Sequence, residues 1–167
     1  MKKQITGIIA PLITPFTAQG ALDLAKAKKE IEILIAAGVD GVSPGGSTGE
    51  GASLSDDELV ELVQLIRQVD KDVLLVAGVI RNSTAAAVKA GLAAKEAGAD
   101  ALMVTPVSYN VLVPDDEGNY HFYETISKEV GLPIVIYNVV PQNTISAPLF
   151  SRMLDIENVV GIKQSCG

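Results

Sequence analysis

The sequence is poor in the residues that build disulfides and metal sites. It holds one cysteine, Cys166, which excludes an internal disulfide and suits a reducing compartment such as the cytoplasm. It holds one histidine, His121, and no cluster of cysteine and histidine, so nothing in it resembles a zinc site. No apolar run is long enough to span a bilayer. We therefore expect a cytoplasmic protein that binds no metal and no membrane.

Positive charge is also scarce. The 13 lysines and arginines stand against 20 aspartates and glutamates, for a net charge of −7. A surface of this sign repels phosphates, so we expect neither nucleic acid nor anionic membranes as partners. Lys2 and Lys3 precede an apolar stretch that faintly resembles a secretion signal, but Pro11 and Pro15 interrupt it and no cleavage pattern follows.

The chain does have enough apolar residues for a core, 48% of 167, and its length suits a single domain over residues 1–167. Short apolar runs alternate with segments of helical periodicity, which predicts parallel βαβ units. We expect strands near residues 8–12, 40–43, 73–78, 101–106, 134–138 and 159–165. We expect helices over 23–37, after a capping box at 55–58, from 84 to about 98, over 120–130, and from Ser146 to Leu154.

Two α/β architectures fit this alternation, a doubly wound open sheet and a (β/α)₈ barrel. Residues 36–42 and 96–102 repeat one pattern of helix end, glycine turn, aspartate and strand. An open sheet would gather its polar residues at one switch point, whereas a barrel places them around its mouth. Polar residues here follow many of the strands, which favours the barrel: Thr14, Ser47, Thr48, Thr105, Tyr137 and Lys163.

Lys163 ends an apolar run, Val-Val-Gly-Ile, that is typical of a strand buried on both faces. A desolvated lysine has a lowered pKa, and its free amine can attack a carbonyl group to form a Schiff base. The alternative is that Lys163 simply closes the strand and extends into water. The run alone does not decide between these interpretations.

A glycine-rich loop over residues 44–51 follows the second expected strand and precedes a capped helix. Such a loop offers free backbone N–H groups to an anion. No Gly-Lys-Ser/Thr follows Gly51, so this is not a nucleotide phosphate loop. Ser47 and Thr48 could bind the anion or be plain turn residues, and Tyr137 could be catalytic or a core tyrosine.

Three motifs in this order resemble the dihydrodipicolinate synthase / N-acetylneuraminate lyase family: Gly46–Glu50, Tyr137–Asn138 and Gly161–Lys163. The resemblance implies a (β/α)₈ barrel and a class I enzyme that forms a Schiff base with pyruvate or another 2-oxo acid. It implies no cofactor beyond the lysine imine, and it implies a homo-oligomer. Further stretches similar to the family are residues 10–16, 77–79, 82–84 and 104–106.

The resemblance also implies roles for single residues. Lys163 is expected to form the Schiff base and Tyr137 to shuttle protons. Gly46, Ser47 and Thr48 are expected to receive the carboxylate of the 2-oxo acid. The remaining substrate-binding residues that it implies are Thr14, Tyr109 and Asn143, of which Tyr109 is the candidate to reach a neighbouring subunit's site.

The chain departs from the family pattern in two respects, its loops and its end. The loop after the fourth expected strand, residues 107–110, is shifted. The loop after Asn138 is one residue longer, and Asn143 stands where the synthases carry an arginine for a dicarboxylate partner. The second substrate is therefore open. Dihydrodipicolinate synthase proper and a 2-oxo acid dehydratase or deaminase remain alternatives, as do a barrel that binds a sugar phosphate and a non-catalytic binding module.

The second departure is the end of the sequence, four residues after Lys163. Two strands and the helices that close a barrel are not in it, so we expect a barrel truncated after its sixth strand. Both edges of such a sheet are apolar and unpaired, and we expect the chain alone to self-associate through them.

Overall fold

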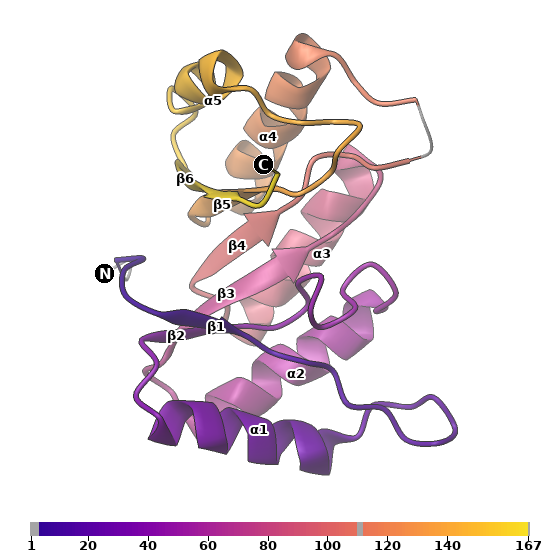
Figure 1. Ribbon diagram of the computed structural model, residues 1–167, viewed down its shortest axis with the longest axis vertical. Coiled ribbons are helices and arrows are strands. Elements are labelled where there is room, and N and C mark those ends of the chain that lie inside the picture. Colours follow the sequence, from indigo (N-terminus) through magenta and orange to yellow (C-terminus); the bar gives the residue numbers. More distant parts are fainter. Residues whose placement is uncertain (1–3, 110–111, 167) are drawn as a thin grey trace. The chain divides into compact units, whose positions relative to one another are not determined.

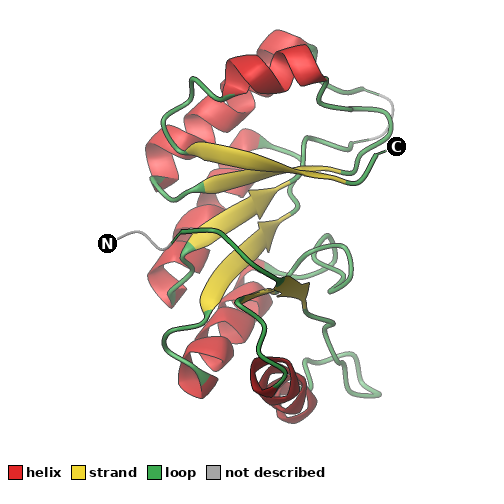
Figure 2. Ribbon diagram, turned by 60° about the vertical axis from the view of Figure 1, so that its left-hand side comes forward, coloured by secondary structure: helices red, strands yellow, loops and turns green. Residues whose placement is uncertain are grey.

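The structure, a computed structural model, describes residues 4–109 and 112–166. The chain divides into two compact units, which we describe separately. The first comprises Met1–Gly78 and Ala93–Asp100, and the second comprises Val79–Leu92 and Ala101–Gly167. Strands and helices alternate along the whole chain, as the sequence predicts (Figures 1 and 2).

The first unit holds three parallel strands and two helices. Strand β1 pairs with β2, and β2 pairs with β3, whose last residue already belongs to the second unit. All six residues of β3 are buried, as expected for a strand covered on both faces. The elements are β1 (Ile9–Pro11), α1 (Leu24–Ala36), β2 (Gly41–Ser43), α2 (Asp56–Val69) and β3 (Leu74–Val79).

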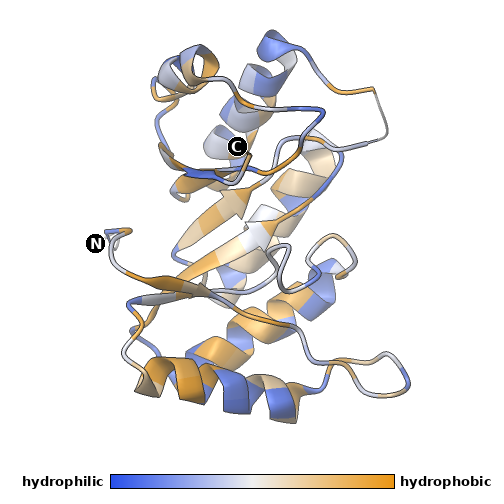
Figure 3. Ribbon diagram, viewed as in Figure 1, coloured by the Kyte–Doolittle hydropathy of each residue, from blue (hydrophilic) through white to orange (hydrophobic). Residues whose placement is uncertain are grey.

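Both helices of the first unit begin at the residues that the sequence indicates. The Asp23 carboxylate accepts a hydrogen bond from the Lys26 N–H at 3.1 Å and caps α1. The predicted capping box of α2 is confirmed: Ser55 Oγ accepts from the Glu58 N–H, and Glu58 Oε2 accepts from the Ser55 N–H. The ribbons of β3 and of β4 are mostly hydrophobic, whereas the helices alternate with polar residues (Figure 3).

The repeated glycine–aspartate pattern has a physical reason. Gly38 and Gly98 adopt φ values of 82° and 115°, which end the preceding helices. The aspartates that follow then cap a neighbouring strand: Asp40 Oδ2 accepts from the Ile8 N–H at 2.7 Å, and Asp100 Oδ2 from the Leu75 N–H at 2.9 Å. Each repeat thus satisfies a backbone donor that would otherwise lack a partner.

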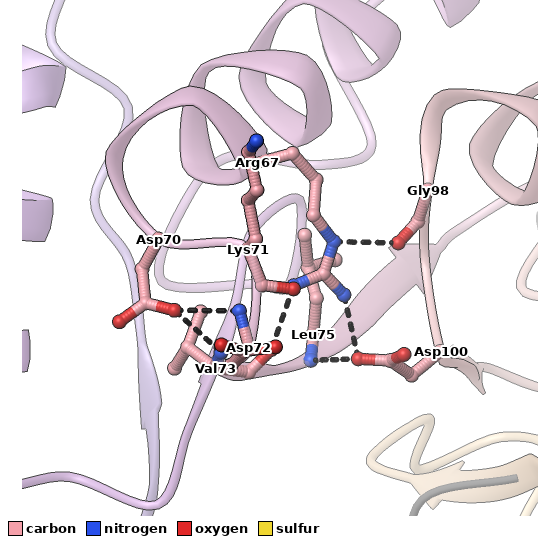
Figure 4. A network of polar contacts seen from close by, with 8 residues as sticks. All are labelled: Arg67, Asp70, Lys71, Asp72, Val73, Leu75, Gly98 and Asp100. Carbon is pink, nitrogen blue, oxygen red and sulfur yellow. Dashed lines mark hydrogen bonds and ion pairs between the residues drawn. The ribbon is translucent and has the colours of Figure 1, made fainter. Parts of the chain in front are cut away.

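Arg67 joins the C-terminal end of α2 to the turn that follows α3 (Thr84–Ala97) (Figure 4). Its guanidinium donates to the Gly98 carbonyl at 2.9 Å, to the Val73 carbonyl at 2.7 Å, and to Asp100 Oδ2 at 2.6 Å. The Arg67 and Asp100 side chains are only 18% and 20% exposed. All the residues of this network belong to the first unit, which it stabilises. None of them is a predicted site residue.

The second unit holds three further parallel strands. Strand β4 pairs with β5, and β5 pairs with β6. The fully buried Tyr123 of α4 donates its hydroxyl to the Val104 carbonyl at 3.1 Å, and burial raises the pKa of this phenol well above its ordinary value. The elements are β4 (Ala101–Val104), α4 (Asp116–Val130), β5 (Ile134–Asn138), α5 (Ala147–Met153) and β6 (Val159–Gln164), and most of α3 also lies here.

Two expectations for the second unit are wrong. Helix α4 begins at Asp116 and not at 120, because Asp115 caps it by accepting from the Gly118 N–H at 2.8 Å. Strand β6 is not buried on both faces, since Val160 is 53% exposed. Among the described residues β6 pairs with β5 alone, so it is an edge strand of the sheet in that part of the chain. Over the same residues, no helix combines the length and the apolar character that crossing a bilayer requires.

Candidate active site

The two predicted catalytic residues lie side by side in the second unit. Tyr137 of β5 and Lys163 of β6 occupy the same register position of the parallel pair. Paired residues of neighbouring strands project from the same face, and Lys163 Nζ lies 3.7 Å from the centroid of the Tyr137 ring. A cation at this distance is attracted by the negative face of the ring. The structure therefore brings an amine and a phenol together at the carboxyl ends of two strands.

Lys163 differs from the expectation in its surroundings. Its side chain is exposed, whereas the Tyr137 side chain is 6% exposed. Within residues 4–109 and 112–166, the Lys163 side chain makes no hydrogen bond and no ion pair, and its amino group contacts the Tyr137 ring. The amino group is thus held by the backbone of β6 and by one aromatic face.

The residues that follow Tyr137 and Lys163 are joined on the other face of the strands. Asn138 is fully buried, and its Nδ2 donates to the Ile145 carbonyl and to Gln164 Oε1, both at 2.9 Å. Its Oδ1 accepts from the Ile145 N–H at 2.9 Å. The sequence draws attention to Asn138 through the motif Tyr-Asn. It does not reveal the two hydrogen bonds of this side chain to Ile145, in the loop after β5.

Asn143 lies in the loop after β5 and is 5% exposed. Its Nδ2 donates to the Val107 carbonyl at 2.9 Å and to Asn119 Oδ1 at 3.1 Å, while its Oδ1 accepts from Asn119 Nδ2 at 2.8 Å. Both amide hydrogens of Asn143 are therefore engaged within the protein. Asn119 was not predicted from the sequence, where it falls at the end of the long loop before the expected helix and has no distinguishing signal.

The loop after β4 carries Tyr109, whose side chain is 58% exposed. The preceding Ser108 donates its N–H and its hydroxyl to Asn82 Oδ1, both at 3.0 Å, and Gln142 donates to the Ser108 carbonyl at 3.2 Å. Three loops of the second unit, after β3, β4 and β5, are thus tied together. Tyr109 stands on the exposed side of this network, available to another molecule.

The glycine-rich loop belongs to the first unit. Ser47 and Thr48 are exposed, and within the described part of the chain neither makes a hydrogen bond that would occupy its hydroxyl or its N–H. Thr14 is 7% exposed and donates its hydroxyl to the Gly49 carbonyl at 2.6 Å, so it holds the loop in place. Gly46 accepts from the N–H groups of Gly49 and of Gly51 through its carbonyl.

Close backbone packing explains why this loop is rich in glycine. A Cβ on Gly51 would lie 1.7 Å from the Gly45 carbonyl oxygen, and a Cβ on Gly78 would lie 2.3 Å from the same atom. Neither approach is possible for any other residue type. The loop therefore packs closely against the end of β3 through Gly45 and Gly78. Ser47 and Thr48 lie at its exposed part.

No group of three or more histidines, cysteines, aspartates or glutamates is placed to hold a metal ion in residues 4–109 and 112–166. Cys166 is partly exposed and His121 is exposed beside Glu124. In the second unit, the described residues offer the chemistry of an amine beside a phenol.

The sequence model of the Dihydrodipicolinate synthetase family matches residues 4–167. The chain belongs to this family. The resemblance on which the sequence expectations rest is thereby confirmed, together with the α/β fold class and the synthase and lyase enzymes that the family contains.

Named members of the family are similar along nearly the whole chain. A 4-hydroxy-tetrahydrodipicolinate synthase from Bartonella bacilliformis is 39% identical over 98% of this chain and 56% of its own length. The dihydrodipicolinate synthase of Acinetobacter baumannii, solved with pyruvate, has a TM-score of 0.89 and 35% identity over 96% of this chain and 55% of its own. N-acetylneuraminate lyase from Fusobacterium nucleatum has a TM-score of 0.89 and 27% identity, and the match covers 98% of this chain and 57% of the lyase.

The chain thus spans about half the length of the curated relatives that it matches. The match covers both units, and it includes the Tyr137–Lys163 pair of the second unit and the Ser47–Thr48 loop of the first. The solved structures of the family are longer than this chain, which covers 56% and 55% of two of them.

Proposed function

We propose that the protein that carries this sequence is a Schiff-base lyase, which makes or breaks a carbon–carbon bond next to pyruvate or another 2-oxo acid. The observation that carries the proposal is the contact of Lys163 Nζ with the Tyr137 ring, 3.7 Å from its centroid. An amine at a strand end beside a phenol is the minimum that imine chemistry requires. A family member solved with pyruvate supports the 2-oxo acid as substrate.

The steps follow from the chemistry of these groups. The neutral Lys163 amine attacks the ketone carbon to form a carbinolamine. A proton delivered by Tyr137 lets the carbinolamine hydroxyl leave as water, which leaves a protonated imine. The imine withdraws electrons from the neighbouring carbon, so a proton or a carbon substituent can leave as the enamine forms. Tyr137 carries the proton to or from the reacting atoms. No further cofactor is needed, because the imine itself is the electron acceptor.

Ser47 and Thr48 are proposed to receive the carboxylate of the 2-oxo acid, with Gly46 shaping the turn and Thr14 supporting it. Their unoccupied hydroxyls and N–H groups support this role, since a carboxylate binds where several donors are free. Tyr109, exposed at 58%, is proposed to reach the site of a neighbouring subunit in a cytoplasmic homo-oligomer.

The synthase proper, which makes 4-hydroxy-tetrahydrodipicolinate, is a second candidate because several similar relatives carry that name. The residue at position 143, an asparagine, argues against synthase activity. The resemblance places an arginine there in the synthases, and the Asn143 amide hydrogens are already donated to Val107 and Asn119. A dicarboxylate partner would find no charged donor at this position, so we favour a different second substrate.

Deuterium exchange into the methyl group of pyruvate tests the proposal without knowledge of the second substrate. Enamine formation releases a methyl proton, and reprotonation in D₂O inserts deuterium, which proton NMR detects. We expect exchange with the wild-type protein and none with Lys163→Arg, which keeps the charge but cannot form the imine. Lys128→Arg, an exposed lysine of α4, is the matched control and should exchange normally. Equal exchange in all three proteins would refute the lysine imine.

A further inference from the structure

Strands β5 and β6 are joined on both faces at their carboxyl ends. Tyr137 and Asn138 are successive residues, as are Lys163 and Gln164, so their side chains project to opposite faces. On one face Lys163 Nζ lies over the Tyr137 ring, and on the other Asn138 Nδ2 donates to Gln164 Oε1 at 2.9 Å. The two contacts therefore act on adjacent positions of the same strand pair.

Asn138 is itself held rigidly. It exchanges two hydrogen bonds of 2.9 Å with the backbone of Ile145, one through each polar atom of its carboxamide. Its side chain is 0% exposed and Ile145 is 3% exposed, so water does not compete for these bonds. Both amide hydrogens are used, one on Ile145 and one on Gln164, which fixes the orientation of the amide plane.

The chain after Lys163 depends on this residue. The Asn138 carbonyl accepts hydrogen bonds from the Ser165 N–H at 3.0 Å and from the Cys166 N–H at 3.1 Å. Together with the Gln164 side chain, these bonds tie the three residues that follow Lys163 to a single residue of β5. Among the described residues the Lys163 side chain has no hydrogen bond or ion pair, so the path of the β6 backbone determines where Nζ can lie.

We propose that Asn138 is a positioning residue that holds Lys163 over Tyr137 by anchoring the end of β6 to the loop after β5. The consequence for catalysis rests on the proposed Schiff-base function. Asn138 touches neither the substrate nor the reacting atoms; it acts through Gln164 and the backbone beyond it. Reaction rates depend steeply on such placement, since a shift of about 1 Å can cost roughly 100-fold.

The chain offers a matched control in Asn158, which is 6% exposed and precedes the first residue of β6. Its Nδ2 donates to the carbonyl and to Oγ of Ser127, at 3.2 and 3.1 Å. Asn158→Ala therefore removes buried side-chain hydrogen bonds of the same kind as Asn138→Ala, but at the opposite end of the strand from Lys163. If Asn138 had only a structural role, Asn138→Ala and Asn158→Ala would have the same effect on Lys163.

The first readout is independent of any reaction. Protons held over an aromatic face resonate upfield, so the side-chain methylene signals of Lys163 report its position over Tyr137 by NMR. We expect Asn138→Ala to lose most of this upfield shift and Asn158→Ala to keep it. Gln164→Ala changes an exposed side chain and removes its hydrogen bond with Asn138. It replaces Asn138→Ala as the test if that variant fails to fold. We expect the Lys163 methylene signals of Gln164→Ala to lose their upfield shift as well.

The second readout is the rate at which borohydride traps pyruvate on Lys163. We expect Asn138→Ala to lower it roughly 10-fold to 100-fold, and Asn158→Ala to leave it close to wild type. The proposal is overturned if Asn138→Ala and Gln164→Ala keep the upfield shift, if Asn158→Ala loses as much, or if trapping is unaffected by Asn138→Ala. A wild-type protein with the expected shifts that traps no pyruvate refutes the proposed function instead, and leaves the positioning of Lys163 by Asn138 supported.

Discussion

Lys163 Nζ lies 3.7 Å from the centroid of the Tyr137 ring, on neighbouring strands in register. The ring alone makes this contact, so the phenol hydroxyl can be removed without losing it. Position and proton transfer can therefore be separated by mutation. Lys163 Nζ contacts the ring, while the proposed reaction depends on the hydroxyl.

Tyr137→Phe separates the position of Lys163 from proton transfer. Phenylalanine keeps the ring volume, so we expect a stability change of no more than about 1 kcal/mol. Proton shuttling should fall, lowering deuterium exchange into pyruvate roughly 100-fold or more. Tyr123→Phe is the matched control, because it also removes a buried hydroxyl from the second unit, away from Lys163, and should leave exchange unchanged. Exchange within about threefold of wild type in Tyr137→Phe, less than 1 kcal/mol of barrier, would show that Tyr137 only packs.

Tyr123 gives the chain a distinct response to alkaline pH. Burial raises the pKa of Tyr123 above its ordinary value in the folded state. The folded state then keeps its proton where the unfolded state loses it, so the stabilising contribution is complete below about pH 10 and is lost as the pH rises further. We expect the free energy of unfolding to fall above about pH 10, by up to roughly 1.4 kcal/mol per pH unit from this residue.

Urea unfolding at a series of pH values measures this slope. Tyr123→Phe should cost about 1 kcal/mol at neutral pH, through loss of the bond to the Val104 carbonyl, and should flatten the alkaline decline. A decline of the same steepness in Tyr123→Phe would assign it to other groups.

Arg67 should be the most sensitive surface position of the first unit. Arg67→Ala removes the donor to Gly98 and Val73 and breaks the ion pair with Asp100, in which both side chains are largely buried. We expect a loss of about 2–4 kcal/mol in the free energy of unfolding. Lys28→Ala breaks an exposed pair with Glu32 and should cost no more than about 0.5 kcal/mol. Equal losses in the two variants, measured by urea unfolding, would contradict the network in Figure 4.

Sequence patterns located the elements well where the local signal and the tertiary structure agree. The predicted strand over 134–138 is β5, and the capping box at Ser55 begins α2. The expected start of α4 at residue 120 is wrong, although the sequence carries an N-cap signal further upstream, Asp115 followed by two acidic residues.

Other features lie beyond a sequence pattern. The run around Lys163 is apolar, but burial also needs a neighbour on each side, and β6 has a described neighbour only in β5. The pairing of Asn143 with Asn119 joins residues 24 positions apart through side chains, and no periodicity reports it. The proximity of Lys163 and Tyr137 was predictable, because parallel strands that are adjacent in order bring their carboxyl ends together.

Borohydride trapping tests the central claim most directly. The protein is incubated with pyruvate, reduced, digested and mapped by mass spectrometry, with a full-length synthase of the family as positive control. We predict that the pyruvate adduct is found on the Lys163 peptide, that it requires both pyruvate and borohydride, and that Lys163→Arg abolishes it while Lys128→Arg does not. An unmodified Lys163 peptide beside a modified control enzyme, or an adduct spread evenly over exposed lysines, would contradict the account.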